Sequence, residues 1–384
     1  MEVEKKSRKM IQIGACMVLA AIFVLLLFEL NKPAAGETAT SASQLVFVKA
    51  HVTRIVREDA SPDTWTEGRR LGTQEVYVQL DSGAFQGKEL PAVNYLNAYT
   101  NVDLKKGTPV IVRLDYDQQG NPYVASIPNY NRGMVLTGLA LVFLGLLIAL
   151  GGKKGVSAVI SLLFTIICIW FFLIPLLERG VSAIPATVAL VGVTTAVSLL
   201  LLNGFTSKTF CATVGCVGGV SMAGIAAAVT GVLTPLNGFN MAEAEELVLR
   251  AGDSGLKISG LLVSGVLISA LGAVMDVAMT ITSAVYELHD MNPEADRKKL
   301  FRSGIHIGRD AMGTMANTLI LAFAGASLNL LILFRVFDYP YIQIFNSDMM
   351  AIEMIQGLAG SIGIVLTVPL VAGLSAFIYG KKVK

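Results

Sequence analysis

The sequence has little charge for its length and few residues of the kinds that build metal or disulfide sites. Of 384 residues only 15% are charged, and the chain holds three histidines and four cysteines. Soluble domains carry roughly 25% charged residues, so an ordinary soluble protein is excluded. The net charge of +2 is too balanced for a protein whose partner is nucleic acid. All four cysteines lie in apolar stretches, which predicts small buried side chains rather than a disulfide framework.

Motifs of catalysis and cofactor binding are also missing. The chain contains no HExxH, no GxSxG, no P-loop and no CxxC. His51, His289 and His306 are too widely spaced to indicate a metal site. Intramembrane aspartyl proteolysis needs two carboxylates that share a proton, and only one lies deep in an apolar stretch. We therefore expect no enzyme, no cofactor and no bound metal.

Long apolar stretches dominate what is present. Hydrophobic residues make up 54% of the chain, and the mean hydropathy is +0.64. A helix needs about 20 apolar residues to cross the hydrocarbon core of a bilayer. The sequence therefore predicts a polytopic α-helical membrane protein with about eight transmembrane helices. The predicted spans are Ile11–Phe28, Gly133–Gly152, Gly155–Leu177, Val181–Leu202, Thr209–Pro235, Ile258–Tyr286, Ala311–Phe334 and Met354–Tyr379.

The distribution of lysine and arginine in the short loops predicts the orientation. With the N-terminus inside, the inner loops and termini hold 15 basic residues, and the outer short loops hold only 4. Cytoplasmic loops carry the excess of basic residues, so we expect a multi-pass cell membrane protein with both termini in the cytoplasm. The first stretch reads as an uncleaved anchor, because it is longer than the apolar core of a signal peptide. A cleaved signal peptide is the alternative.

One long polar segment, residues 31–132, interrupts the apolar pattern, and the topology places it outside the membrane. Alternating apolar residues predict strands at 45–52, 75–80, 110–114 and 123–127, and Gln119–Pro122 is typical of a hairpin turn. Closing such strands into a small barrel would remove their exposed edges. We therefore divide the chain into the N-terminus with the first helix (1–30), an extracytoplasmic all-β domain (31–132) and a seven-helix transmembrane domain (133–384).

The sixth predicted span contains the one acidic residue deep in a span. Asp276 costs roughly 2.5–3.5 kcal/mol on membrane insertion scales, so such a residue normally faces a bundle interior or a water-filled cavity. Ser269, Thr280, Ser283 and Glu287 share its helix face at 3.6 residues per turn. The spacing predicts a polar stripe that runs to the cytoplasmic end of the helix.

The seventh span carries a matching set of polar residues. Asp310, Thr314 and Asn317 fall on one face near its cytoplasmic end, and we expect Asn317 and Asp276 to lie at similar depth. A protonatable carboxyl with amide and hydroxyl partners binds a cation, relays a proton or orients a polar substrate. Two plainer interpretations stay open. Hydroxyl and amide groups also join helices structurally, and Asp310 and Glu287 suit helix ends, where Asp310 would favour the helix dipole.

Two further segments concern packing and surface contacts. Residues 292–302 are basic and amphipathic, which predicts a short cytoplasmic surface helix between the sixth and seventh spans. Gly215, Gly219 and Gly224 in the fifth span predict close approach to a neighbouring helix.

Four stretches resemble a known family. The runs 272–279 and 308–322 resemble the signature segments of the YibE/F-like family of polytopic bacterial membrane proteins. The segments 107–110 and 130–132 resemble the extracytoplasmic part of its members. The resemblance implies a bacterial membrane protein over the whole chain. It implies little about function, because members are described as membrane proteins, and sometimes as transporters, without a substrate or a mechanism.

Two functions from different classes remain. The first is a transporter or permease that uses Asp276 with polar residues of the next helix and moves an unknown solute or ion. The second is a membrane scaffold or sensor whose β domain binds an envelope component or a partner protein. If eight spans are too few to enclose a transport pathway, a second copy of the chain or a partner membrane protein would complete it. We expect the protein to be embedded in the lipid bilayer, and we expect no nucleic acid among its partners.

Overall fold

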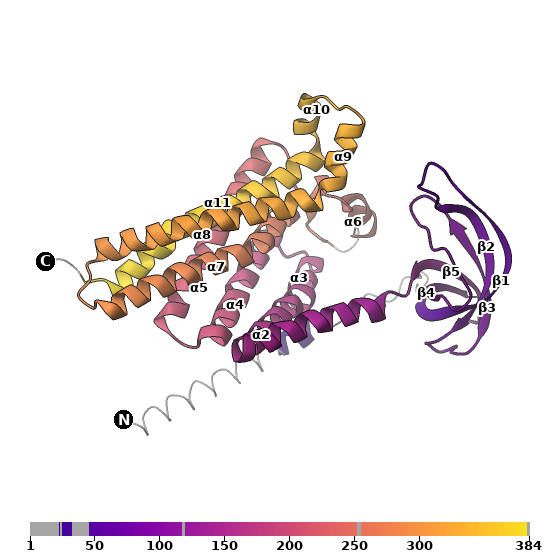
Figure 1. The fold of residues 1–384 in the computed structure, drawn as a ribbon, viewed down its shortest axis with the longest axis horizontal. Helices are drawn as coiled ribbons and strands as arrows, with labels where there is room; N and C mark the ends of the chain where they lie inside the picture. The colour runs from indigo at the N-terminus through magenta and orange to yellow at the C-terminus, as the bar shows by residue number, and fades with distance from the viewer. Residues whose placement is uncertain (1–22, 24, 33–45, 117–119, 252–254, 382–384) are drawn as a thin grey trace, which may run out of the picture. The chain divides into compact units, whose positions relative to one another are not determined.

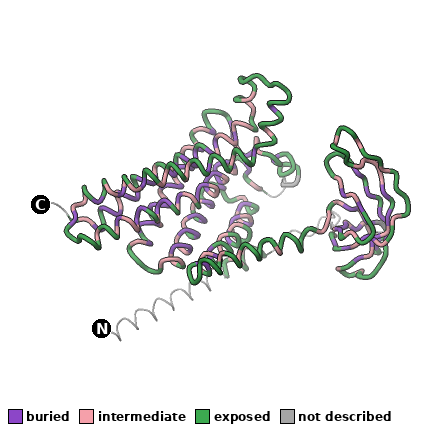
Figure 2. Tube along the Cα trace, in the orientation of Figure 1, coloured by how far each residue is buried: buried purple, intermediate pink, exposed green. Residues whose placement is uncertain are grey.

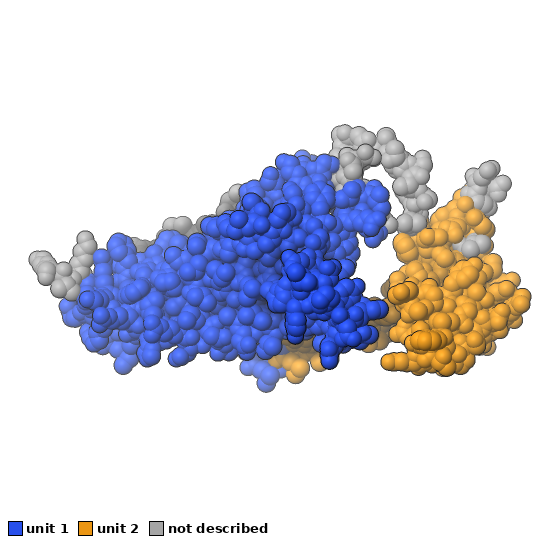
Figure 3. Space-filling view, turned by 90° about the horizontal axis from the view of Figure 1, so that it is seen from above, with its two compact units in different colours: residues 1–32, 147–384 blue, residues 33–146 orange. Residues whose placement is uncertain are grey.

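The computed structural model describes residues 23, 25–32, 46–116, 120–251 and 255–381. The chain divides into two compact units, shown in different colours in Figure 3. One unit comprises Met1–Lys32 with Leu147–Lys384, and the other comprises Pro33–Leu146. Figure 1 shows that the first is helical and that the second is built around a small β structure.

The β structure is a closed five-stranded barrel with the strand order β1-β2-β3-β5-β4. All neighbouring strands are antiparallel except β3 and β5, which run parallel and pair Ala92 with Ala125 and Val93 with Ser126. β1 pairs with β2 and β4, which closes the barrel. This strand order is that of the OB-fold. The strands are β1 (Val46–Pro62), β2 (Arg70–Leu80), β3 (Glu89–Leu96), β4 (Pro109–Tyr116) and β5 (Pro122–Tyr130).

The barrel encloses its own hydrophobic core, which confirms the predicted β domain. Alternate residues of each strand point inward, and Val52, Val78, Val110 and Val112 are fully buried. The prediction missed β3, where Pro91 interrupts the apolar alternation, because proline is unfavourable within most strands. β4 and β5 pair as expected for a hairpin, although the turn residues 117–119 lie outside the described part of the chain.

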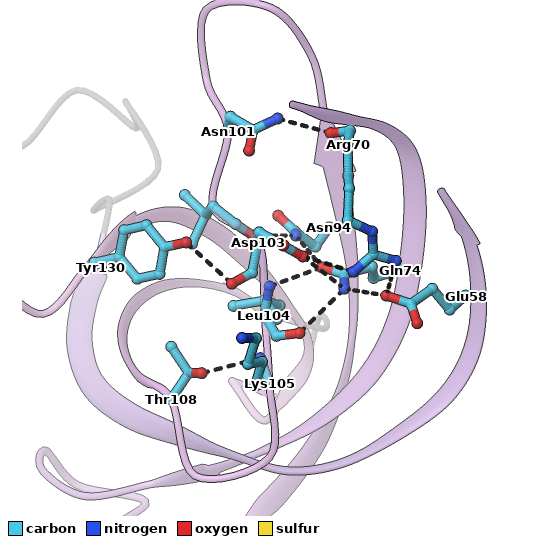
Figure 4. A network of polar contacts seen from close by, with 11 residues as sticks. Glu58, Arg70, Gln74, Asn94, Asn101, Asp103, Leu104, Lys105, Thr108 and Tyr130 are labelled. Atoms are coloured by element: carbon cyan, nitrogen blue, oxygen red, sulfur yellow. Dashed lines mark hydrogen bonds and ion pairs between the residues drawn. The ribbon is translucent and has the colours of Figure 1, made fainter. Parts of the chain in front are cut away.

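A polar network fixes the loop between β3 and β4 at one end of the barrel (Figure 4). Gln74 is fully buried, and its Nε2 donates to Glu58 Oε1 (2.7 Å) and to the Leu104 carbonyl oxygen (3.1 Å). Its Oε1 accepts from Asn94 Nδ2 and from Leu104 N, both at 3.0 Å. The Gln74 amide and the Arg70 guanidinium donate to Glu58 and lower the pKa of that carboxyl. The network ties three strands and the loop together.

The other unit is a helical bundle, in which buried positions concentrate where the helices pack (Figure 2). Its long helices are α4 (Ala183–Asn203), α5 (Ser207–Leu233), α7 (Leu261–Met291), α8 (Arg297–Ala326) and α11 (Asp348–Tyr379). The remaining helical elements are α2 (Gly133–Cys168), which begins in the other unit, η1 (Ile169–Leu173), α3 (Ile174–Glu178), η2 (Gly238–Asn240), α6 (Ala244–Ala251), η3 (Ile258–Gly260), α9 (Leu328–Val336) and α10 (Tyr341–Asn346).

Among the described residues, five helices are long and apolar enough to cross a membrane, and the bent pair α8–α9 would make a sixth. The predicted first span lies mostly outside these residues. The predicted second and third spans fall in one helical stretch, Gly133–Glu178, which breaks at Gly152 (φ 53°, ψ −131°). Its 46 residues would measure about 69 Å as a straight helix, roughly twice the hydrocarbon thickness. A multi-pass membrane protein follows from these helices, and the count of eight spans stays a prediction.

Glycines bring α5, α7 and α11 close together, as the sequence predicted for α5. A Cβ on Gly219 would lie 3.0 Å from both Thr367 Cβ of α11 and Val274 Cγ1 of α7. A Cβ on Gly224 would lie 2.7 Å from Leu267 Cδ2 of α7. Without side chains at these positions the backbones approach closely, which is how membrane helices gain packing contacts. The predicted close approach is therefore confirmed.

The structure corrects the expectation for residues 292–302. They do not form a separate surface helix, because α8 starts at Arg297 and continues without interruption to Ala326. The Arg297 side chain donates to the carbonyl oxygens of Gly380 and Phe377 (both 3.0 Å) and lies over the Phe377 ring. These contacts hold the start of α8 against the end of α11. The predicted straight seventh span also bends by 58° at Ser327, between α8 and α9.

Adjacent glycines of α5 provide a matched test of the packing. We expect Gly219→Ala to destabilise the bundle by about 1–3 kcal/mol, because the new methyl group overlaps Thr367 and Val274. Gly218→Ala meets only Leu370 Cδ1 at 3.5 Å, so it should leave stability unchanged or raise it slightly. Thermal unfolding of the two purified variants in detergent measures the difference. Equal melting temperatures would contradict the packing described here.

Gln74 offers the corresponding test in the barrel. We expect Gln74→Leu to destabilise the barrel by about 2–4 kcal/mol, because it leaves the buried Leu104 N–H without its acceptor. Gln79→Leu is the control, since Gln79 is only partly buried and donates one hydrogen bond of 3.3 Å to Gly87. Hydrogen exchange of β2 in the full chain, read by mass spectrometry, separates the two. Unchanged protection in Gln74→Leu would show that the network adds no stability.

Candidate functional site

α7 carries the predicted polar stripe, and the stripe points away from the packed core. Gly272, Asp276, Thr280 and Glu287 are exposed, and Ser269 and Ser283 are partly exposed. The opposite side of the helix is buried against α5 and α11, through residues such as Leu267 and Val274. The shared face predicted from the spacing is therefore present. It lies on the surface of the described chain rather than in the bundle interior.

α8 presents a second polar surface of the same kind. Asp310, Gly313, Thr314 and Asn317 are exposed, while Gly304, Gly308 and Leu319 are buried. A Cβ on Gly304 would lie 2.9 Å from Ala372 Cβ, and a Cβ on Gly360 would lie 2.7 Å from Leu319 Cδ2, so the buried side of α8 packs against α11. α7 and α8 thus both turn their polar sides away from α11. We call Asp276, Thr280, Ser283, Asp310, Thr314 and Asn317, with Gly272 and Gly313, the α7–α8 polar face.

Contacts between α7 and α8 fix their antiparallel register. A Cβ on Gly308 would lie 2.9 Å from Ile281 Cδ1, and a Cβ on Gly304 would lie 3.1 Å from Val285 Cγ2. The same register puts Gly313 at the depth of Asp276. Asn317 lies four residues farther along α8, about 6 Å deeper. The two residues predicted to face each other therefore differ in depth by about one helical turn.

Asp276 has no partner among the described residues. No hydrogen bond or ion pair joins it to any of them, Asn317 included. The Thr314 hydroxyl donates to the Asp310 carbonyl oxygen (3.3 Å), and the Thr318 hydroxyl donates to that of Thr314 (2.9 Å). These hydroxyls keep lone pairs that can accept from, or coordinate, another group. The polar face thus offers an unpaired carboxyl and free oxygen atoms at the middle of two apolar helices.

Glu287 has a structural contact that the sequence did not indicate. Its Oε1 accepts from Lys208 Nζ at 2.8 Å, and the same ammonium lies 3.8 Å from the centre of the Tyr286 ring. Lys208 is in the first turn of α5, so the pair joins the end of α7 to the start of α5. This ion pair agrees with the plainer interpretation of Glu287 as a residue that pairs at a helix end.

The proposed capping role of Asp310 is wrong. α8 begins at Arg297, so Asp310 lies 13 residues inside the helix, beyond the reach of its first-turn amides. The apolar run starts only at Ala311, which is why a helix end was predicted at Asp310. The exposed carboxyl of Asp310 is instead part of the α7–α8 polar face, next to the exposed Arg309.

A second acidic group in the bundle was not predicted from the sequence. Glu353 of α11 has a buried Oε2 without a hydrogen-bond partner, and the same is true of the Ser327 hydroxyl at the bend between α8 and α9. Both residues line a cavity of about 190 Å³ that is otherwise apolar. Glu353 is one residue before the last predicted span, so a span boundary placed a turn earlier would have drawn attention to it.

No group suited to a metal was found in the part of the chain that the structure describes: no three His, Cys, Asp or Glu residues gather there. Cys168, Cys211 and Cys216 are buried and free. The α7–α8 polar face itself offers carboxyl, hydroxyl and amide groups. Such groups bind protons, monovalent cations and polar solutes.

Comparison with known proteins identifies the family. Residues 139–381 match the family model described as YibE/F-like protein, which is more than half of the chain. The chain belongs to the YibE/F-like family. The match includes α7 and α8 and every candidate site residue, and it confirms the family predicted from residues 272–279 and 308–322. No curated protein and no solved structure matches the chain.

The barrel precedes the matched region, since the YibE/F-like match begins at residue 139. The resemblance of segments 107–110 and 130–132 to family members therefore stays a prediction. The family description names no activity, so the function of this YibE/F-like protein has to be argued from its own side chains.

Proposed function

We propose that this YibE/F-like protein transports a solute or an ion along the α7–α8 polar face, with Asp276 as the group that binds the cation or proton. The observation that supports the proposal is the unpaired carboxyl of Asp276 on the exposed side of an apolar helix. An asparagine would make nearly the same hydrogen bonds without the cost of ionisation in the membrane. A carboxyl at this position is therefore best explained by a step that needs its charge or its proton.

The neighbouring groups suit the same role. Thr280 and Ser283 on α7 and Asp310, Thr314 and Asn317 on α8 extend the polar face along the helices. Such a series offers successive oxygen atoms to an ion or a polar solute that leaves water. We propose that it lines one side of the pathway, with both termini of the chain in the cytoplasm and the barrel outside.

The test is proton flux in proteoliposomes. We expect the wild type to dissipate an imposed pH gradient in the presence of its solute or ion, screened from a panel of small ions and solutes. Asp276→Asn should reduce this flux to the rate of empty liposomes, because it removes the titratable group and keeps the shape. Glu178→Gln is the control, since Glu178 is exposed at the end of α3 and is not part of the α7–α8 polar face. Equal flux in wild type and well-folded Asp276→Asn would reject the proposal.

A second candidate function belongs to the barrel, where three aromatic side chains are largely exposed. Trp65 is 93% exposed, Tyr95 67% and Tyr99 96%. The turn that carries Trp65 and the loop that carries Tyr99 are held together by hydrogen bonds from Arg69 to Ala98 and from Asn101 to Arg70. OB-folds bind oligosaccharides and oligonucleotides on their β2–β3 surface and adjacent loops. We propose that the barrel binds an envelope glycan through these rings.

Ring removal tests this second function. We expect Trp65→Ala and Tyr99→Ala to weaken binding of cell-wall oligosaccharides to the full-length protein, each by about 1–3 kcal/mol if the rings stack on sugars as they do on bases. Tyr123→Ala is the control, because Tyr123 is 55% exposed at the start of β5, at the opposite end of the barrel. Titration followed by Trp65 fluorescence, or by calorimetry for Trp65→Ala, measures the affinities. Equal affinities in all variants would exclude this surface.

A further inference from the structure

The α7–α8 polar face needs a cover that the described chain does not supply. Asp276 and Thr280 are exposed at the middle of the apolar helix α7, and Thr314 and Asn317 are exposed where α8 passes from its basic start to its apolar half. Lipid tails offer no hydrogen bonds, so charged and amide side chains in spans face protein or water. The face must therefore meet either water or another polar protein surface within the membrane.

The two apolar spans predicted in the first part of the chain do not have the required groups. Residues 133–151 contain one hydrogen-bonding side chain, Thr137, and residues 11–28 contain only Gln12 besides Cys16. Neither stretch carries a charge or an asparagine. Packing one of them on the polar face would leave most of its carboxyl, amide and hydroxyl groups without partners.

A second copy of the chain has the right groups at the right depths. The α7–α8 register shows which residues of the two helices lie at the same depth in the membrane. These are Gly272 and Asn317, Asp276 and Gly313, Glu287 and Arg302, and Asp290 and Lys299. The cytoplasmic end of α7 thus exposes Glu287 and Asp290, and α8 exposes Arg302 and Lys299 at the same levels. A two-fold axis along the membrane normal would place α7 of one copy against α8 of the other, so acidic residues would meet basic ones.

The same two-fold rotation brings polar partners from the second copy to Asp276. Thr314 of the second copy would lie within one residue of the depth of Asp276, and Asn317 of the second copy about one turn deeper. A two-fold interface is self-complementary, so each contact forms twice. Gly272 and Gly313 carry no side chain, and nothing described lies within 4 Å of the position of a Cβ on either, which leaves room for close helix approach.

We infer that two copies of this protein associate through the α7–α8 polar face, and that Thr314 and Asn317 of one copy complete the site of Asp276 in the other. The inference depends on the polarity of the face rather than on transport. If transport occurs as proposed, the pathway lies between the copies.

The experiment is disulfide cross-linking between two differently tagged copies in native membranes. One copy carries Gly272→Cys and the other Asn317→Cys, two exposed positions at equal depth, so folding should be preserved. We expect oxidation to give a linked dimer that carries both tags. The control pair is Val214→Cys with Ile225→Cys, exposed apolar positions of α5 that keep all native cysteines. Cross-linking no greater than in the control pair would overturn the inference.

A second measurement does not depend on cysteine. Subunit counting by photobleaching in lipid bilayers should find two copies for the wild type and a larger share of single copies for Asp276→Ala combined with Asn317→Ala. Asp276→Asn should keep two copies, because the amide still hydrogen-bonds. Single copies of the wild type at every protein-to-lipid ratio would also overturn the inference. A dimer that shows no flux would support the proposed interface and reject the proposed transport. Flux from single copies would support transport and reject the interface.

Discussion

The close approach of α5 to α11 determines where the other helices of the bundle lie. A Cβ on Gly363 would lie 2.9 Å from the Gly219 carbonyl oxygen, so the two backbones are nearly in contact. α7 fits into the same contact through Val274, and α8 packs on the other side of α11 through Gly304 and Gly308. Because α5, α8 and α11 pack closely through glycines and α7 contacts α5 through Val274, the polar sides of α7 and α8 face outward. The exposed position of Asp276 is thus a consequence of glycine packing on the opposite side of α7, at Val274.

Much of the architecture could be predicted from the sequence, because its signals are local. Apolar runs of membrane length gave the long helices, and alternation gave most of the barrel strands. The five polar positions of α7 share one face because the helical period is fixed. Periodicity identifies a face, however, and does not say which way the face points. That direction is set by contacts such as Gly219 with Val274, between residues 55 positions apart. It was therefore beyond reach from the spacing alone.

Other features could not be predicted from the sequence, and the reason differs from one element to the next. β3 contains Pro91, which interrupts the alternation of apolar residues, and it pairs with β5 in parallel and across a long stretch of sequence. Neither a hairpin turn nor an alternating pattern therefore indicated this strand. The start of α8 is polar and basic, which concealed its continuity with the apolar part of the helix. Glu353 lies at the edge of an apolar run, and only the bend at Ser327 reveals that its carboxyl is partly enclosed. In each case a tertiary contact overrides a local pattern.

The contacts of Arg297 have a consequence for the order in which the protein is made. Its guanidinium donates to the Gly380 and Phe377 carbonyl oxygens, and the Lys381 N–H donates to the Ala295 carbonyl oxygen. These groups are synthesised at least 80 residues after Arg297, near the end of α11. Chains grow from the N-terminus at about 5–20 residues per second. The start of α8 therefore waits several seconds for its partners during synthesis, and a chain that stopped before Phe377 would leave the Arg297 guanidinium without these two acceptors.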